Sequence, residues 1–323
     1  MKPRVEVHLD EEERRASLLR DASQGLQAPG KHLPPVWFYD EVGSRLFDTI
    51  TRLDAYYPTR VERALLAKYA DEIAALASAA SLVELGSGTS DKTRVLIEAM
   101  SDQGDLRSYI PFDVSETTLR RAADELAVSY PGITIHGVIG DFHRHIDRIP
   151  GSGRRLFAFL GGTIGNLRPS ERQDFYTRLR STMRDGDSFL MGADLLKDRR
   201  RLVAAYDDPE GITAEFNLNV LSVLNRELGC DFDPQRFSHL AIWNEAEGWM
   251  EMRLRSLADQ TVEVGALGLS ITFSEGEDLL TEISAKFDLD SLLDELSRAG
   301  LSVEAVWGDP GEYALTMAVP AGS

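Results

Sequence analysis

Residues 82–92 read LVELGSGTSDK, a short apolar strand that runs into a glycine turn, and this segment constrains the fold more than any other. Gly86 and Gly88 remove two side chains where the backbone can approach a ligand closely. A helix expected from Asp91 onwards would direct its first N–H groups to the same place. The segment predicts a site for a nucleotide-like cofactor, although an ordinary strand-to-helix turn would also explain a single G-x-G.

Asp91 decides between three classes of cofactor. The stretch Gly86 to Thr93, GSGTSDKT, matches a phosphate-binding P-loop except that Asp91 replaces the second glycine, and a carboxylate there would repel phosphates. The dinucleotide fingerprint G-x-G-x-x-G fails at the same position. S-adenosylmethionine carries no phosphate, and its ammonium and sulfonium groups are compatible with nearby acids such as Glu84. The turn therefore favours S-adenosylmethionine.

Segments with strand and helix periodicity alternate around the turn. Alternation of this kind predicts a parallel sheet with helices on both faces. The expected helices are residues 61–80, 93–100, 115–129 and 170–183, and the expected strands are 82–85, 108–112, 133–139, 155–160 and 188–193.

The rest of the chain follows other patterns. The first sixty residues contain an acidic helix, a Pro-Pro break and an aromatic stretch, and residues 198–285 combine a helix-like stretch with strand-like runs. A helix at 289–299 then leads to two strands joined by the short turn Asp309 to Gly311, so these strands must be antiparallel. A doubly wound sheet that ends in an antiparallel hairpin is the architecture of class I methyltransferases.

Acidic residues end the first three predicted strands of the sheet. Ligands of open α/β sheets bind beyond the carboxyl ends of the strands, so these side chains should face the cofactor. Asp113 could accept both ribose hydroxyl protons. Asp141 could accept from the adenine amino group while Phe142 packs on the purine. Helix capping is the alternative for each acid taken singly.

Composition narrows the class of protein. The net charge of −18 argues against a nucleic-acid partner, and no segment approaches the roughly 18 apolar residues of a membrane span. The single cysteine, Cys230, rules out an internal disulfide and fits a reducing cytoplasm. We expect a cytoplasmic monomer with a small-molecule substrate and no membrane partner.

Four blocks of sequence make the chain recognisable. In order they read PPxWFYDxVGSxLFDxITRLxxYYPTR from Pro34, VELGSGTSxKTR from Val83, FLGGTIGN from Phe159 and LTEISAKF from Leu280. These blocks closely resemble those of the histidine Nα-methyltransferases of ergothioneine biosynthesis (EgtD). The likeness extends from about residue 18 to residue 319.

The resemblance implies a Rossmann-like methyltransferase core with a terminal antiparallel hairpin, formed by residues 61–196 and 286–323. A second, α+β substrate-binding domain would comprise residues 1–60 and 197–285. The residues implied to contact S-adenosylmethionine are Gly86, Gly88, Lys92, Asp113, Asp141 and Phe142.

The resemblance also implies a histidine site. Tyr56, Asn166 and Tyr206 would hold the α-carboxylate and amine, with Gly161 nearby, while Glu282 and Ser284 would bond the imidazole. The family block usually reads FLGSTIGN, whereas this chain has Gly162 in place of the serine.

Simpler interpretations exist for several of these residues. Asn166 suits an amine and a carboxylate together because its amide both donates and accepts, yet it could be only a turn residue. Tyr39, Tyr56 and Tyr206 could be core aromatics, and Glu282 could be an exposed strand acid. His143 and His145 lack a third ligand, so we expect no metal site.

The expected reaction is threefold methylation of the α-amine of L-histidine to hercynine, with S-adenosylhomocysteine as the second product. Tyr39 and Asn166 are the candidates for aligning the amine lone pair, and no side chain stands out as a general base. Another amino acid, such as a tryptophan derivative, is the alternative substrate. A non-catalytic cofactor-binding protein, or a methyltransferase for proteins or nucleic acids, would be a different class.

Overall fold

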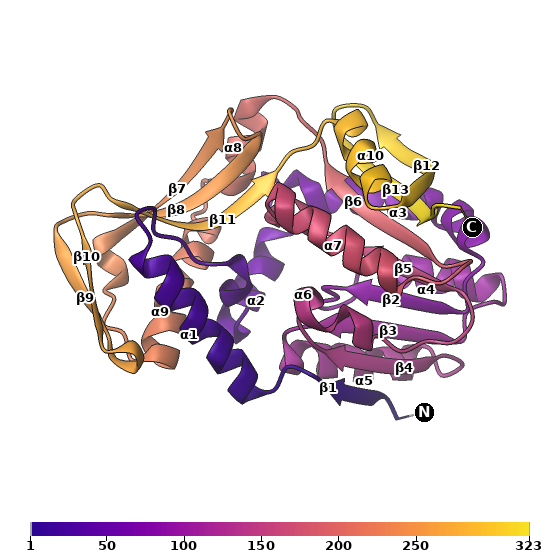
Figure 1. Cartoon of the computed structure of the whole chain (residues 1–323). Helices are drawn as coiled ribbons and strands as arrows, with labels where there is room; N and C mark the ends of the chain where they lie inside the picture. Colours follow the sequence, from indigo (N-terminus) through magenta and orange to yellow (C-terminus); the bar gives the residue numbers. More distant parts are fainter. Residues whose placement is uncertain (1, 323) are drawn as a thin grey trace. The chain divides into compact units, whose positions relative to one another are not determined.

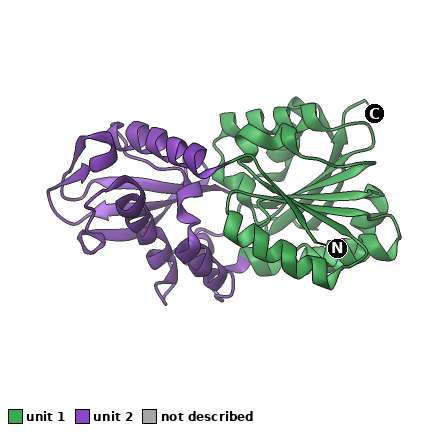
Figure 2. Cartoon of the chain, turned by 90° about the horizontal axis from the view of Figure 1, so that it is seen from below, with its two compact units in different colours: residues 1–9, 58–196, 286–323 green, residues 10–57, 197–285 purple. Residues whose placement is uncertain are grey.

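A computed structural model describes residues 2–322 of the chain (Figure 1). These residues form two compact units (Figure 2). Unit 1 contains the chain up to Leu9, residues 58–196 and the chain from Lys286, and unit 2 contains residues 10–57 and 197–285. The boundaries predicted after residues 196 and 285 fall at these divisions.

Within the described residues, unit 1 is built on an eight-stranded sheet of order β1-β4-β3-β2-β5-β6-β13-β12. The strands from β1 to β6 pair in parallel, whereas β13 pairs antiparallel with both β6 and β12. The predicted terminal hairpin is therefore confirmed. The strands are β1 (Arg4–Val7), β2 (Ser81–Leu85), β3 (Ser108–Asp113), β4 (Thr134–Ile139), β5 (Arg155–Phe159), β6 (Ser188–Asp194), β12 (Leu301–Asp309) and β13 (Tyr313–Pro320).

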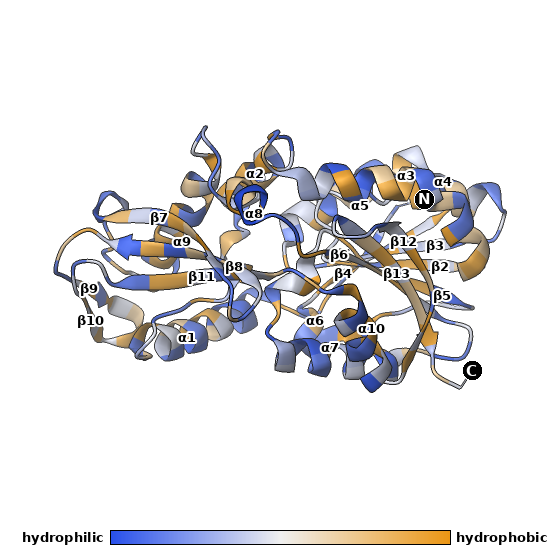
Figure 3. Ribbon diagram, turned by 90° about the horizontal axis from the view of Figure 1, so that it is seen from above, coloured by the Kyte–Doolittle hydropathy of each residue, from blue (hydrophilic) through white to orange (hydrophobic). Residues whose placement is uncertain are grey.

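Helices cover both faces of this sheet, as the alternating pattern predicted (Figure 3). On one face lie α3 (Tyr57–Ala77), α4 (Arg94–Asp102) and α5 (Glu116–Ser129). On the other lie α6 (Phe142–His145), α7 (Pro169–Thr182) and α10 (Leu289–Arg298). Two short 3₁₀ turns, η2 (Ile146–Arg148) and η3 (Thr163–Asn166), stand in the connections after β4 and β5.

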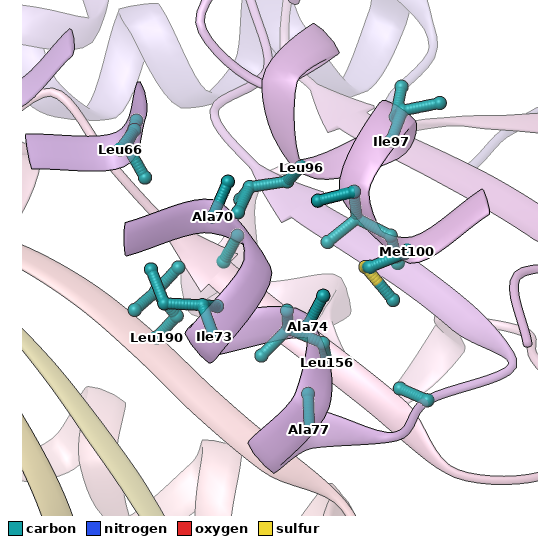
Figure 4. Close-up of a cluster of buried hydrophobic side chains, with 14 of the residues drawn as sticks. Leu66, Ala70, Ile73, Ala74, Ala77, Leu96, Ile97, Met100, Leu156 and Leu190 are labelled. Carbon is teal, nitrogen blue, oxygen red and sulfur yellow. The ribbon is translucent and has the colours of Figure 1, made fainter. Parts of the chain in front are cut away.

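The α3 face of the sheet holds a core of small and aliphatic side chains (Figure 4). Ile73 and Ala74 of α3 pack with Leu96 of α4 and Leu156 of β5. Alternate strand residues, such as Phe157 and Phe159, point to the other face because side chains alternate along a strand. Burial on both faces explains why these strands read as continuous apolar runs.

The strand order reverses between β2 and β5, since β2 pairs with β3 on one side and with β5 on the other. In open parallel sheets, ligands bind at this switch point, beyond the carboxyl ends of the strands. The glycine turn follows β2, and the Gly161–Gly162 pair follows β5. The topology therefore brings these two glycine segments to one end of the sheet.

The assignment of all of residues 1–60 to the substrate domain was wrong at the N-terminal end. Strand β1 pairs in parallel with β4, and the N–H of His8 donates to the carbonyl of Ile139 at 2.8 Å. The chain up to Leu9 therefore belongs to unit 1. Four residues give too short a pattern to predict a strand, and β1 forms by pairing with the edge of β4.

Unit 2 combines helices with small antiparallel sheets, as the α+β prediction required. Among its described residues the sheet β11-β8-β7 has three strands and the sheet β10-β9 has two. The elements are α1 (Glu11–Gln27), η1 (Pro35–Phe38), α2 (Glu41–Ile50), α8 (Arg199–Tyr206), α9 (Ile212–Leu228), η4 (Pro234–Arg236), β7 (Phe237–Asn244), β8 (Trp249–Ser256), β9 (Gln260–Val264), η5 (Gly265–Leu267), β10 (Leu269–Phe273) and β11 (Asp278–Ala285).

The N-terminal segment of unit 2 joins the later insertion through main-chain hydrogen bonds. The N–H of Leu33 donates to the carbonyl of Leu280 at 2.8 Å, and the N–H of Leu280 donates to Lys31 at 2.9 Å. The 3₁₀ turn η1 places Phe38 against Phe216 of α9, with ring centroids 4.6 Å apart. Two parts of the sequence separated by residues 58–196 of unit 1 thus make one folded unit.

Candidate functional site

The glycine turn after β2 leaves open space above its backbone. Gly86 and Gly88 have φ values of 68° and 50°, a region that favours glycine, and a Cβ added to either would meet no atom within 4 Å. The turn is fixed from below, because the N–H of Gly86 donates to the carbonyl of Phe112 at 2.8 Å. This open space is compatible with the close approach of a ligand to the backbone.

Glu84 lies beneath the turn. Its side chain is 3% exposed and accepts hydrogen bonds from the hydroxyls of Thr93 and Tyr109. Burial raises the pKa of Glu84 to about 7, although both hydroxyl bonds act in the opposite direction. Glu84 therefore shapes the turn from inside the core.

Asp113 ends β3 beside the turn. Its Oδ2 accepts from the N–H of Gly88 at 2.8 Å, and its Oδ1 accepts from the N–H of Ser115 at 2.8 Å. Burial raises the pKa of Asp113, and the backbone bonds lower it in part. Each carboxylate oxygen keeps further capacity to accept a hydrogen bond.

Asp141 and Phe142 follow β4. Asp141 caps α6, since its Oδ1 accepts from the N–H of His143 at 2.8 Å, so the capping role considered for this acid is present. The half-buried ring of Phe142 makes edge contacts with Phe159 and Phe175, at centroid distances of 5.3 and 5.6 Å. The two residues lie at the same end of the sheet as the glycine turn, because β4 and β2 are parallel strands of one sheet.

Lys92 has an acidic partner that sequence reasoning missed. Its Nζ lies 2.6 Å from the Oε2 of Glu62, a fully buried residue of α3. The Oε1 of Glu62 accepts from the N–H of Gly161 and from the hydroxyl of Tyr313, both at 2.7 Å. One carboxylate thus ties together α3, the glycine turn, the loop after β5 and β13. A lone glutamate in a helical pattern gave no signal of this role.

The loop after β5 carries Asn166 at the end of η3. Gly161 and Gly162 precede it with φ values of 85° and 68°. A Cβ on Gly161 would lie 3.0 Å from the Nζ of Lys92, so the loop passes directly over the lysine. The left-handed backbone at Gly162 explains why glycine is accommodated where the family usually has serine. Gly161 and Asn166 belong to unit 1.

The remaining predicted substrate residues come together in unit 2. Tyr39 contacts Phe47, Phe47 contacts Tyr56, and Tyr56 contacts Tyr206, with ring centroids 5.6 to 6.2 Å apart. The hydroxyl of Tyr206 donates to the Oγ of Ser284 at 2.7 Å. The rings therefore pack on one another as core aromatics do, and the hydroxyl of Tyr206 also has a polar partner.

Glu282 is buried, with 9% of its surface exposed, so it is no exposed strand acid. It lies two residues before Ser284 in β11, and the two pair with Met252 and Met250 of β8. Neighbouring strand residues at this spacing share one face of the sheet. The carboxylate of Glu282 and the hydroxyl of Ser284, which are predicted to bind the substrate ring, therefore lie on the same face of β11.

Metal sites and membrane spans are two further features for which the described residues can be searched. Within residues 2–322, no cluster of three or more His, Cys, Asp or Glu side chains could hold a metal ion. No helix in the same range is both long and apolar enough to cross a membrane. His145 instead accepts the N–H of Asp141 on its Nδ1 at 3.1 Å, which ties this histidine to the loop after β4.

Comparison with known proteins agrees with this geometry. Residues 18–320 match the family model for histidine-specific, S-adenosylmethionine-dependent methyltransferases. The histidine N-alpha-methyltransferase of Mycobacterium tuberculosis (strain CDC 1551 / Oshkosh) is 51% identical over 319 residues, which cover 98% of this chain and 99% of that protein. The enzyme of the same name from Mycolicibacterium smegmatis (strain ATCC 700084 / mc(2)155) is 53% identical over 304 residues, 94% of this chain and 95% of that protein.

A fungal relative is similar over a shorter stretch. Ergothioneine biosynthesis protein 1 of Neurospora crassa is 33% identical over 204 residues, which cover 62% of this chain and 23% of that protein. The family model, in contrast, matches all of the chain except its ends, including both glycine segments and β11. The chain belongs to the family of histidine-specific, S-adenosylmethionine-dependent methyltransferases.

Proposed function

We propose that the protein methylates the α-amine of L-histidine three times to give hercynine, as the first step of ergothioneine biosynthesis. The observation that carries this proposal is the pair Glu282 and Ser284, buried on one face of β11 with Ser284 bonded to Tyr206. An imidazole ring has one donor and one acceptor nitrogen, which a carboxylate and a hydroxyl on one face would complement. Family membership supports the same substrate.

The methyl donor in this proposal is S-adenosylmethionine, held at the carboxyl ends of β2, β3 and β4. The open backbone at Gly86 and Gly88 fits a ligand that packs directly on the turn. Asp113 would accept from the ribose hydroxyls, and Asp141 with Phe142 would hold the adenine. Lys92, which is half-buried beside the Gly161 loop, would face the carboxylate of the methionine part.

The roles proposed for single residues toward L-histidine rest on the resemblance to the family. Tyr56, Tyr206 and Asn166 would bind its carboxylate and amine beside Gly161, and Glu282 with Ser284 would bind the ring. Tyr39 and Asn166 would orient the amine lone pair. When bound, S-adenosylmethionine supplies an activated methyl group: the nitrogen–carbon bond forms as the carbon–sulfur bond breaks, and the sulfur keeps the electron pair.

Positioning is the main contribution that these residues make to the reaction. Holding the amine in line with the methyl group replaces a bimolecular encounter by an oriented one. After each of the first two transfers the amine nitrogen carries a positive charge, and it must lose a proton before it can attack the next methyl group. We propose that water accepts this proton. The aromatic rings of Tyr39 and Tyr56 would stabilise the growing positive charge through cation–π contacts.

One experiment separates this function from the alternatives. The protein is incubated with S-adenosylmethionine and each of the twenty amino acids in turn, and methylated products are detected by mass spectrometry. We expect mono-, di- and trimethylhistidine and no product with the other amino acids. Methylation of tryptophan in preference would support the alternative substrate, and the absence of any product would support a non-catalytic role. A cytoplasmic location and a monomeric state remain part of the proposal.

A further inference from the structure

Strand β11 contains a bulge immediately before Glu282. Leu280 pairs with Arg253 of β8, but Glu282 pairs with Met252, so Thr281 is an extra residue without a partner in the register. Consecutive residues of β8 point to opposite faces of the sheet. Leu280 and Glu282 therefore lie on opposite faces, although residues two apart in an unbroken strand would share one.

The bulge decides where the substrate residues point. In an unbroken strand, Glu282 and Ser284 would lie on the face of Arg253, which is occupied by charged side chains. With the extra residue, they lie on the face of Met252 and Met250, which are 3% and 0% exposed. A one-residue slip moves every later side chain to the other face. Because Thr281 is the extra residue, Ser284 lies on the face where it accepts a hydrogen bond from the hydroxyl of Tyr206.

Asn217 of α9 holds this bulge in place. Its side chain is fully buried, and its Oδ1 lies 2.7 Å from the hydroxyl of Thr281. The same hydroxyl lies 2.9 Å from the carbonyl of Met252, so its single proton has two acceptors. Without these partners the Thr281 hydroxyl would be buried and unbonded.

The other end of the Asn217 amide reaches Tyr206. Its Nδ2 donates to the carbonyl of Arg253 at 3.1 Å and to the Nδ1 of His239 at 2.8 Å. A carbonyl only accepts, which fixes the orientation of the amide. The Nδ1 of His239 is therefore an acceptor, and its Nε2 donates to the main-chain carbonyl of Tyr206 at 2.8 Å. Burial lowers the pKa of His239, in agreement with a neutral ring.

We infer that Asn217 is a positioning residue for the amino-acid site, because one buried amide fixes both the Thr281 bulge and, through His239, the main chain of Tyr206. It does not touch the substrate in this inference. It sets the face on which Glu282 and Ser284 lie and the place of the tyrosine they meet. The inference rests on the proposed function, in which these three residues bind L-histidine.

Asn225 provides a matched control on the same helix. Its amide also makes two hydrogen bonds, donating to the carbonyl of Phe232 at 2.7 Å and accepting from the N–H of Phe232 at 2.9 Å. These bonds hold the loop after α9 and make no contact with β11 or Tyr206. Replacing it removes a comparable amide from unit 2 without touching the inferred network.

The test compares Asn217→Leu with Asn225→Leu in the full-length protein, with measurement of KM for histidine, KM for S-adenosylmethionine, kcat and thermal unfolding. We expect Asn217→Leu to raise KM for histidine about tenfold or more, since buried partners are left unbonded. KM for S-adenosylmethionine should change less than about twofold, within the ordinary effect of a distant substitution. Asn225→Leu should lower the unfolding temperature and leave both KM values near those of the wild type.

A milder variant keeps the inference testable if Asn217→Leu does not fold. Thr281→Val retains the β-branched shape and removes only the hydroxyl, and we expect a selective rise in KM for histidine. Combining it with Glu282→Gln should give less than the product of the two single effects, because both act on one contact with the ring.

Two results would overturn the inference. One is an equal change in KM for histidine and KM for S-adenosylmethionine in Asn217→Leu and Thr281→Val. The other is an equal effect of Asn217→Leu and Asn225→Leu on KM for histidine. A wild-type protein that makes no methylated histidine would instead overturn the proposed function. The two failures are distinguishable because the inference is tested by comparing the variants with an active wild type, whereas the proposed function is tested on the wild type alone.

Discussion

The Nζ of Lys92 lies 2.6 Å from the carboxylate of Glu62, thirty residues earlier in the chain. Glu62 is fully buried, and its second oxygen accepts from Gly161 and Tyr313. This carboxylate therefore connects the lysine of the glycine turn to the loop that carries Asn166. A disturbance of Glu62 should reach both segments.

Glu62→Ala should destabilise the protein by about 3 kcal/mol, because it leaves an amine, a main-chain N–H and a hydroxyl without their acceptor. Chemical unfolding in urea measures the change. Glu72→Ala, at an exposed position of the same helix α3, is the control and should remain within about 0.5 kcal/mol of the wild type. Similar losses in the two variants would contradict the role given to Glu62.

The stability of the protein should depend on pH through Glu84. Its pKa is about 7 in the folded protein and 4.5 when unperturbed, so between these values the folded state binds a proton that the unfolded state has lost. Stability therefore falls as the pH rises through this window, and the contribution of Glu84 above pH 7 is unfavourable. The difference between a pKa of about 7 and one of 4.5 corresponds to a change in the free energy of unfolding on the order of 3 kcal/mol.

Glu84→Gln tests this pH dependence. The amide cannot ionise, so the difference in free energy of unfolding between variant and wild type should shift in favour of the variant as the pH rises from about 5 to 8. Urea unfolding at several pH values gives this difference directly. A difference that stays constant with pH would show that Glu84 does not titrate in this range.

Glu282→Ala should weaken the binding of histidine by roughly 1 to 3 kcal/mol, since the imidazole loses a hydrogen-bond partner in a buried site. The affinity for S-adenosylmethionine should stay nearly the same. Isothermal titration with each ligand measures both quantities. Glu275→Ala, an exposed acid of the same unit, is the control, and equal losses for the two ligands would refute the assignment of Glu282.

Gly162→Ser restores the residue usual in the family and should lower stability by about 1 kcal/mol, because the left-handed backbone is unfavourable for a residue with a Cβ. The expected loss comes from the φ value of 68° and not from a clash. An added Cβ would lie 3.7 Å from the Tyr313 hydroxyl, which is an ordinary contact distance. Thermal unfolding measures the effect. Gly30→Ser, at an exposed position with no atom near the added Cβ, should change the unfolding temperature little.

Part of the site could be predicted from local sequence alone. The strand-and-turn pattern at Gly86 and the acid at Asp113 were identified from their own surroundings, since period and glycine content act within a few residues. Resemblance to the family supplied Tyr206, Glu282 and Ser284. The fold places these three together in unit 2, yet nothing in the local pattern of β11 indicated which face Glu282 would take.

The sequence by itself determined the parallel sheet, its terminal hairpin and the glycine turn, because each depends on periodicity and on backbone freedom within one short segment. Only the tertiary structure decided the pairing of Lys92 with Glu62 and the bulge at Thr281, which Asn217 holds from 64 positions away. Such contacts join residues that are far apart in the chain, and no periodicity or motif in the sequence relates the two positions. They form because buried polar groups must find partners wherever folding brings them together.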